Sequence, residues 1–446
     1  MKKINMNSKM KWLVLSLLVL GSLLSSCKDS FENEIIDINN PVPEGPAEAD
    51  MSQPYNKFPQ LGAWLRAWEE TDESWSNINS NIYADLAVRR PQVAVDGQGN
   101  ALVVAQGKGN NKIYARIAKV VEEKGRISLD WQSEYKQLSS SSTALQYPSV
   151  VLMDDGQFFI AAASGHRLRY WSGSMNGNSL TFKNSSTQLA SLGSKSKYGF
   201  TDAAVTDDGL ILVTYDKHGD LSRNEVQYSA GRFQGGGSIK WIKNPNPDNN
   251  NESYSFRIKR EGQIGNKGMR GPSISIRRNK NVNAGTEYRV LFSHHNGSTN
   301  YLVYGKIIDT GDESLNRDKG YNHILWKNKN GSFVRTTDAR SKSVNPSGTN
   351  IHRSSVVLTD NDKFFLIYDN DNNKGRYITG TYDGANLSRQ SGGGGQYIKL
   401  NLKGGVSRVS ASKIPNSDRF IVVYHNVNKD EDGNTNNIKY NFYELK

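Results

Sequence analysis

One hairpin-like pattern recurs six times along the 446-residue chain, and this repetition restricts the possible folds more than any other feature. Each copy has a short apolar run, a turn rich in Asp, Asn, Gly or Lys, and a second run of β-branched or aromatic residues. The copies read RRPQVAVDGQGNALVVAQGKG, QYPSVVLMDDGQFFIAAASGH, FTDAAVTDDGLILVTYDKHG, RGPSISIRRNKNVNAGTEYRVLFSHH, HRSSVVLTDNDKFFLIYDND and SRVSASKIPNSDRFIVVYHN. Such repetition predicts one small unit that is used several times around a shared core.

A third strand candidate follows every copy, and a fourth follows five of them. The third candidates are KIYARIAKV, LRYWSGS, VQYSAGR, NYLVYGKII, RYITGTY and NIKYNFYEL, and the fourth are LDWQSEY, LTFKNSS, IKWIKN, HILWKN and QYIKLN. Four antiparallel strands repeated about every 50 to 80 residues are typical of a β-propeller. We therefore predict an all-β protein with a six-bladed β-propeller; five or seven blades, with one copy miscounted, is the alternative.

The sixth copy ends after its third strand, which would leave an open edge in the last blade. Unpaired strand edges are unfavourable, so another segment should cover this one. Two stretches before the first repeat are available, LGAWLRAWEETDESW at 61–75 and NIYADLAV at 81–88. We expect one of them to pair with the C-terminal blade and close the ring.

The N-terminus has the three parts of an export signal. A basic MKKINMNSKMK precedes the apolar WLVLSLLVLGSLL, and SSC follows at once. Leu24-Ser25-Ser26-Cys27 resembles the lipobox of bacterial lipoproteins, which implies a signal peptide at 1–26 and lipidation of Cys27. Cys27 is the only cysteine, so no internal disulfide can form. The alternative is an ordinary secretory signal with a chance cysteine.

Residues 27–57 are acidic, contain proline and show no periodicity, which predicts a flexible tether before a propeller domain at 58–446. The acidic start resembles the surface-export signal of Bacteroidota lipoproteins. This resemblance implies a protein that is anchored to the outer membrane by lipid alone and faces the cell surface; a periplasmic orientation is the alternative.

The chain carries a formal charge of +12, and loss of the signal peptide with its four lysines leaves about +8. A basic surface favours anionic partners. The sequence shows no zinc-binding spacing, aromatic-basic RNA-binding signature or basic helical region, which argues against nucleic acid. We expect an acidic polysaccharide or sialylated glycan as the partner, no metal or cofactor, and a monomer.

Arginine recurs where the first strand of a repeat begins. Counted back from the proline of RRPQ, QYPS and RGPS, the six matching positions are Arg89, Gln146, Phe200, Arg270, Arg353 and Arg408. First strands line the central channel of a propeller, so these positions should converge at its mouth. Clustered guanidiniums need an anion and grip carboxylate or sulfate bidentately. We predict that Arg89, Arg270, Arg353 and Arg408 bind the ligand; the alternative is scaffolding, with pairing to Asp202 or Asp369.

Three of the seven histidines follow second strands, each two residues after a matching position. They are His166, His218 and His295, after Ser164, Asp216 and Ser293. Second strands end at the face where first strands begin, so these histidines should lie near the arginines. With Tyr147 they are the candidate catalytic residues; ordinary turn positions are the alternative.

The hairpin wording, with Arg two residues before Pro and then VAVDGQGNALVV, resembles the opening blade motif of sialidases and of related propellers with Asp-box repeats. The resemblance covers residues 86–446 and implies that Arg89, Arg270 and Arg353, with Arg408 as a substitute, hold a substrate carboxylate. The sequence departs from the family at several points. The Asp-boxes at Asp154 and Asp207 lack the usual Thr and Trp, no Asp follows the first hairpin, and no Tyr-Glu nucleophile pair can be assigned.

Four functions remain open at this point. A glycan-binding lipoprotein needs only the arginines and aromatic platforms, and it fits the degenerate motifs best. A sialidase-type hydrolase would need an acid and a nucleophile. A polysaccharide lyase would need an arginine to neutralise a uronate and a His or Tyr to abstract a proton. A protein-docking scaffold would need neither.

Overall fold

The computed structural model describes residues 65–67, 71–73, 88–107, 110–123, 126–133, 135–138, 144–191, 196–219, 225–243, 254, 256–258, 270–282, 285–309, 324–327, 333–334, 341–344, 351–359, 363–370, 375–383, 386–390, 398–399, 406–426 and 438–445. All of them belong to one compact unit, Met51–Lys446. The predicted signal peptide, the lipidation site Cys27 and the tether lie outside the described residues.

The first three sheets follow one another along the chain and are antiparallel. Sheet 1 contains β3 (Val88–Val95), β4 (Asn100–Gly107), β5 (Ile113–Glu123) and β6 (Arg126–Trp131), with β7 (Lys136–Gln137) also beside β5. Sheet 2 contains β8 (Gln146–Leu152), β9 (Gln157–Ser164), β10 (Arg167–Asn176) and β11 (Ser179–Ser191). Sheet 3 contains β12 (Ser196–Val205), β13 (Leu210–Gly219), β14 (Glu225–Phe233) and β15 (Ile239–Trp241), with β16 (Phe256–Arg257) beside β14.

The second half repeats this order. Sheet 4 contains β17 (Arg270–Val282), β18 (Gly285–His295), β19 (Asn300–Asp309), β20 (Leu325–Lys327) and β21 (Phe333–Val334), with β22 (Ser341–Ser343) beside β19. Sheet 5 contains β23 (Ile351–Leu358), β24 (Lys363–Asn370), β25 (Gly375–Tyr382) and β26 (Leu387–Gln390), with β27 (Ile398–Lys399) beside β25. Sheet 6 contains β28 (Val406–Lys413), β29 (Arg419–Asn426) and β30 (Ile438–Leu445) with β1 (Leu65–Ala67) and β2 (Thr71–Glu73).

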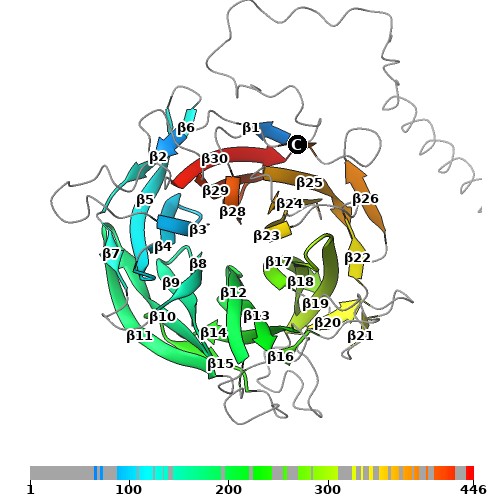
Figure 1. The fold of residues 1–446 in the computed structure, drawn as a ribbon, viewed down its shortest axis with the longest axis horizontal. Coiled ribbons are helices and arrows are strands. Elements are labelled where there is room, and N and C mark those ends of the chain that lie inside the picture. Colours follow the sequence, from blue (N-terminus) through cyan, green and yellow to red (C-terminus); the bar gives the residue numbers. More distant parts are fainter. Residues whose placement is uncertain are drawn as a thin grey trace, which may run out of the picture. The chain divides into compact units, whose positions relative to one another are not determined.

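The all-β prediction is confirmed, and each of the six sequence repeats forms the first two strands of one sheet. The sheets are arranged around a common centre, with β3, β8, β12, β17, β23 and β28 nearest to it (Figure 1). These six strands, named here the inner strands, contact one another in chain order, and β28 also contacts β3. The first strand of each repeat is therefore innermost, as the repeat pattern predicted.

The N-terminal segment pairs with the last strand, as expected from the sequence. Leu65 lies opposite Leu445 in β30, and Thr71 lies opposite Tyr440. Both β1 and β2 come from the stretch 61–75, the first of the two candidate segments. An early segment and the C-terminal strand thus share sheet 6.

Hydrogen bonds join every pair of neighbouring sheets, through residues of the inner strands or of the turns that follow them. Each bond uses a side-chain oxygen, and the edge of an inner strand that faces the centre has no strand partner for its backbone groups. The bonds are Gly97 N to Asp154 Oδ1 (2.5 Å), Thr201 Oγ1 to Tyr147 O, Ser273 Oγ to Asp202 Oδ2 (2.6 Å), Val356 N to Ser273 Oγ (3.0 Å), Ala411 N to Ser355 Oγ (2.9 Å) and Ser410 Oγ to Gln92 Oε1 (2.6 Å). The last bond links sheet 6 to sheet 1.

The hydrophobic core lies between the faces of neighbouring sheets. Between sheets 3 and 4, for example, Leu212 and Tyr228 pack with Ile274 and Val290, and all four side chains are buried. Because both faces of a sheet are covered, strands such as β4 are buried along almost their whole length. Among the described residues, no helix has the length and apolar character needed to cross a membrane.

The shared sheet generates a stability prediction. A chain that begins at Ser76 lacks β1 and β2 and leaves the outer edge of β30 uncovered, whereas a chain that begins at Phe58 keeps both. We expect the free energy of unfolding of the shorter chain to be about 3 kcal/mol below that of the longer chain, since each lost hydrogen bond contributes about 1 kcal/mol net. Urea unfolding followed by tryptophan fluorescence measures the difference, and equal midpoints would contradict the role given to β1 and β2.

Candidate functional site

The inner strands share an irregularity near their first residues. In each of the six, the pairing register with the second strand slips there, for instance between Arg89 and Gln92 in β3 and between Arg270 and Ser273 in β17. A bulge of this kind re-aims the side chains at the end of a strand. The six inner strands therefore begin with side chains that do not follow the usual alternation.

In four of these bulges, the residue that directly follows the last paired position before the bulge has its backbone in the left-handed region. The residues are Arg90 (φ 55°), Tyr147 (φ 53°), Gly271 (φ 54°) and Arg408 (φ 57°). This conformation suits glycine but costs other residues roughly 1–2 kcal/mol each. Three non-glycine residues thus carry backbone strain at equivalent positions, and such strain is concentrated at functional sites.

The strained residues meet around two aromatic rings. The rings of Tyr147 and Phe200 have centroids 4.3 Å apart. The guanidinium carbon of Arg90 lies 3.8 Å from the centroid of Tyr147, and those of Arg353 and Arg408 lie 5.8 and 5.6 Å from Phe200. We name these five residues the arginine cluster; they come from β3, β8, β12, β23 and β28, so five of the six sheets contribute.

Arg90 is fixed in place and poorly compensated. Its side chain is 7% exposed, Nη1 donates to Gln106 Oε1 at 2.6 Å, and Nε is buried with no hydrogen-bond partner. Gln106 Nε2 and Arg89 Nη2 both donate to Asn111 Oδ1, at 2.8 and 3.1 Å. Burial lowers the pKa of Arg90 to about 9, and repulsion from Arg408, Arg89 and Arg353 adds to this, although Tyr147 opposes it. The charged form of Arg90 is thus destabilised when no anion is nearby.

Arg353 is the most deeply buried arginine of the cluster, with 2% exposure, and its Nη2 donates to Thr201 O at 3.4 Å. Burial lowers its pKa and Arg408 lowers it further, while Asp202 and Asp369 act in the opposite direction. The two carboxylates therefore compensate this guanidinium in part.

Those two carboxylates are already engaged by the backbone. Asp202 Oδ2 accepts from Ser273 Oγ and from Ile274 N at 3.0 Å, and Asp369 Oδ2 accepts from Arg408 N at 2.9 Å. Burial raises the pKa of both, against the attraction of Arg353 for Asp202 and of Arg408 for Asp369. Three guanidiniums are thus set against two carboxylates that hold their own charge reluctantly, and the balance favours a bound anion.

The prediction that Arg89, Arg270, Arg353 and Arg408 share one position is wrong. Register places Arg89 and Arg270 before the bulge, Arg408 within it, and Arg353 one residue beyond it. Arg353 and Arg408 still converge on Phe200, because the bulge turns successive side chains toward the same point. Arg89 borders Arg90, and Arg270 is exposed beside His295.

The three candidate histidines do not share a position either. His166 is exposed in the turn between β9 and β10, whereas His295 is buried and pairs in register with Arg270. Burial lowers the pKa of His295 to about 3, helped by Arg270, and its Nδ1 accepts from Gly297 N at 3.1 Å. The backbone of His218 pairs with Lys197, but the side chain of His218 lies outside the described part of the structure. The described histidine side chains therefore form no common catalytic ring.

Tyr147, the remaining catalytic candidate, does reach the arginine cluster, where its ring lies beneath Arg90. Arg90 itself was not a predicted site residue, because counting back from the proline selected Arg89 in its place. Phe200 was aligned with the arginines and not recognised as a platform for them. The signal that would have found Arg90 is its place directly before Pro91. Proline disfavours the right-handed helical region for the residue that precedes it.

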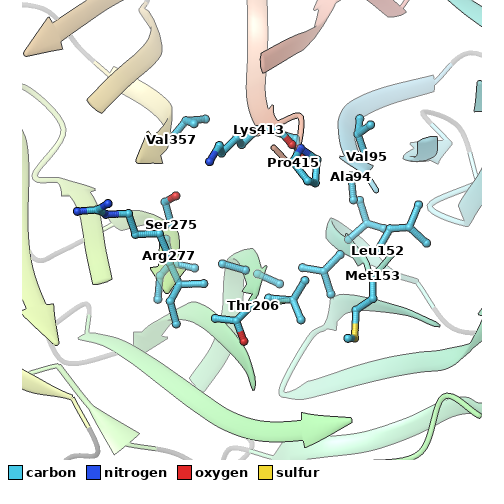
Figure 2. A pocket seen from close by; sticks show the side chains of 18 of the residues that line it. Ala94, Val95, Leu152, Met153, Thr206, Ser275, Arg277, Val357, Lys413 and Pro415 are labelled. Atoms are coloured by element: carbon cyan, nitrogen blue, oxygen red, sulfur yellow. The ribbon is translucent and has the colours of Figure 1, made fainter. Parts of the chain in front are cut away.

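A cavity of about 670 Å³ extends along the inner strands beyond the cluster. Its walls include Val95, Leu152 and Val357, and Lys413 extends toward it from β28 (Figure 2). Asp202, which compensates Arg353, also lines it. The described residues contain no group of three or more side chains that could hold a metal ion.

No family model matches the sequence, and no curated protein matches it. Similar solved structures include a protein of unknown function from Dyadobacter fermentans (TM-score 0.48, 11% identity, 86% of this chain and 100% of that chain) and an α-L-arabinofuranosidase from Fusarium graminearum (0.47, 10%, 84% and 97%). Another is a sialidase from Trypanosoma rangeli (0.43, 10%, 80% of this chain and 55% of that chain). Likeness at this level does not assign a function to this chain.

Backbone strain in the cluster can be tested at Arg408. In an ordinary strand, a protein with glycine is less stable than one with alanine. At φ 57° this order should reverse, because only glycine adopts the left-handed conformation without an energetic penalty. We expect Arg408→Gly to have a free energy of unfolding about 1 kcal/mol above that of Arg408→Ala. Urea unfolding of both variants measures this, and an alanine variant that is equally or more stable would show that the bulge is unstrained.

Proposed function

We propose that the arginine cluster binds the carboxylate or sulfate of an acidic glycan. The observation that carries this proposal is the convergence of three guanidiniums, those of Arg90 and Arg353 buried, on the rings of Tyr147 and Phe200. Guanidiniums supply paired donors to a planar anion, and an aromatic ring beside them offers an apolar face against which a sugar ring packs. Buried charge and backbone strain both lower the stability of the folded protein, and such costs are typical of sites that bind a ligand.

The proposal places this site on a surface lipoprotein. The lipobox-like segment ending at Cys27 and the acidic stretch after it support a lipid anchor on the outer membrane with the folded unit facing the cell surface. We further propose that the six sheets are the blades of one sialidase-like propeller and that β1 and β2 close its ring. The hydrogen bond from Ser410 to Gln92 and the pairing of β1 and β2 with β30 support closure.

Binding without turnover is the function that the geometry supports best. Hydrolysis of a glycosidic bond needs a carboxylic acid free to donate a proton and a second group on the other side of the bond. The acids described beside the cluster, Asp202 and Asp369, accept hydrogen bonds from the neighbouring strand and hold the backbone in position. One oxygen of each carboxylate is therefore held by a neighbouring strand, and the site is suited to hold an anion.

The experiment is calorimetric titration of the mature chain with sialylated, uronate-containing and sulfated oligosaccharides, followed by product analysis of the same samples. The double variant Arg353→Met with Arg408→Gly removes two charges, keeps an apolar side chain in the buried site and relieves the bulge. We expect it to lose at least about 100-fold in affinity, because a hydrogen bond to a charged group contributes roughly 1.5–3 kcal/mol.

Arg278→Ala is the matched control, since Arg278 lies in the same strand as Arg270, is exposed and pairs with Asp207 at 3.3 Å. Its affinity should equal that of the unmodified chain. Unchanged affinity in the double variant would refute the arginine cluster as the binding site. Released sialic acid or an unsaturated uronate would make the protein an enzyme and overturn the proposal of binding alone.

Affinity should also depend on pH through Asp202 and Asp369. Burial raises the pKa of both, so they take up protons as the pH falls from neutral toward the ordinary carboxyl range, while a sulfate ligand stays charged. Loss of these negative charges beside Arg353 and Arg408 strengthens the attraction for the anion. We therefore expect affinity to rise several-fold between pH 7.5 and pH 5, measured in a His352→Gln background because His352 also faces Asp369.

Asp202→Asn combined with Asp369→Asn should remove this rise, since the amides keep an oxygen acceptor and cannot titrate. Affinity that falls on acidification, or a rise that persists in the double amide variant, would contradict the electrostatic account of the site.

A further inference from the structure

We propose that the ligand is a polyanionic chain that crosses the arginine cluster from β3 to β17, with negative charges on several successive sugars, in preference to a glycan with one terminal acidic sugar. This inference rests on the proposed function and specifies its substrate class. It follows from two arginines outside the cluster, Arg89 and Arg270, and from their places in the ring of sheets.

Arg89 and Arg270 occupy the same position in two different sheets. Each pairs in register with the last residues of its second strand, Arg89 with Gln106 and Arg270 with His295, immediately before the bulge. Sheet 1 and sheet 4 are three sheets apart in a series of six, and their inner strands β3 and β17 lie on opposite sides of the common centre (Figure 1). The arginine cluster lies between them, because its members come from the strands that surround that centre.

Positive charge is continuous across this face. Arg89 is close enough to Arg90 to lower the pKa of Arg90, and Arg408 does the same. On the other side, Arg270, His352 and Arg408 all act on His295, which stays neutral. Arg408 therefore interacts electrostatically with both ends, and a negatively charged chain laid across the face would meet cationic side chains along its whole path.

The two outer arginines are also presented to solvent. Arg270 is exposed, and Arg89 is half-buried with its Nη2 oriented by Asn111 at 3.1 Å. The carboxylates of Asp202 and Asp369 compensate the guanidinium of Arg353 in part, and with the two outer arginines this face presents five guanidiniums. One terminal carboxylate engages one or two guanidiniums, whereas a chain with repeated charges engages all five and adds the favourable release of counterions.

The test is a length series with the mature chain in a calorimeter. The probes are mono-, di-, tetra- and hexagalacturonate, a heparin-derived hexasaccharide, sialyllactose as the terminal acid, and a single-stranded DNA oligonucleotide, each at two salt concentrations. We expect hexagalacturonate or the heparin hexasaccharide to bind at least about 30-fold more tightly than digalacturonate or sialyllactose, with a steeper loss of affinity in high salt. The two hexasaccharides distinguish carboxylate from sulfate as the recognised charge.

The variant Arg89→Ala with Arg270→Ala isolates the outer arginines, and Arg278→Ala is again the control. The double variant should weaken hexasaccharide binding at least tenfold and disaccharide binding less than threefold. Equal affinity for sialyllactose and the hexasaccharides, or an equal loss for long and short ligands, would overturn the crossing-chain inference while the proposed function stands. Binding of none of the glycans, or DNA binding as tight as the best glycan, would overturn the proposed function itself.

Discussion

The edge of each inner strand that faces the centre has no strand partner, and the structure depends on how this constraint is met. Side-chain oxygens of Ser273, Ser355 and Asp202 accept from backbone N–H groups of a neighbouring inner strand, as a further strand would. The bond from Ser410 Oγ to Gln92 Oε1 joins sheet 6 to sheet 1. A backbone group left without such a partner would cost about as much as a lost hydrogen bond. These bonds fix the inner strands relative to one another, and they lie within three residues of the bulges that form the site.

The bulges occur at the same place in every inner strand, but each of them presents a different residue to the site. Because all six inner strands bend at the same point, whichever side chain stands there is turned toward the centre. Gly271 takes up the left-handed conformation without penalty, whereas Arg90, Tyr147 and Arg408 do not. The cluster thus combines strained backbone with desolvated charge, two costs that the folded state bears without any stability in return. An anionic ligand would offset the cost of the desolvated charge, which is why we propose that the function lies at this point and not at the cavity along the inner strands.

Sequence reasoning succeeded where local patterns decide the outcome. The alternation of apolar runs and turns predicted the hairpins, and their repetition predicted the repeated sheets with the first strand innermost. The stretch 61–75 was one of two candidates to pair with the last strand, because the last repeat lacked a strand. Arg353 and Arg408 were selected because cationic residues recur near strand starts; both lie near Phe200, and their role in ligand binding stays a prediction.

The errors have one physical origin. A bulge inserts a residue on one strand and shifts the register, so that equal spacing from a proline no longer means an equal position. Arg89 was therefore chosen in place of Arg90, and His166, His218 and His295 were treated as equivalent when they are not. The pairing of Arg90 with Tyr147 joins residues from two sheets, and no pattern within one repeat encodes it.

The most direct test of the central claim is a nuclear magnetic resonance titration that observes the arginine Nε–H groups while hexagalacturonate or heparin hexasaccharide is added. The account predicts that the Nε–H resonances of Arg90, Arg353 and Arg408 shift together, while that of Arg278 does not change. Binding that leaves the three cluster resonances in place would contradict the account, because the anion would then be held elsewhere on the protein.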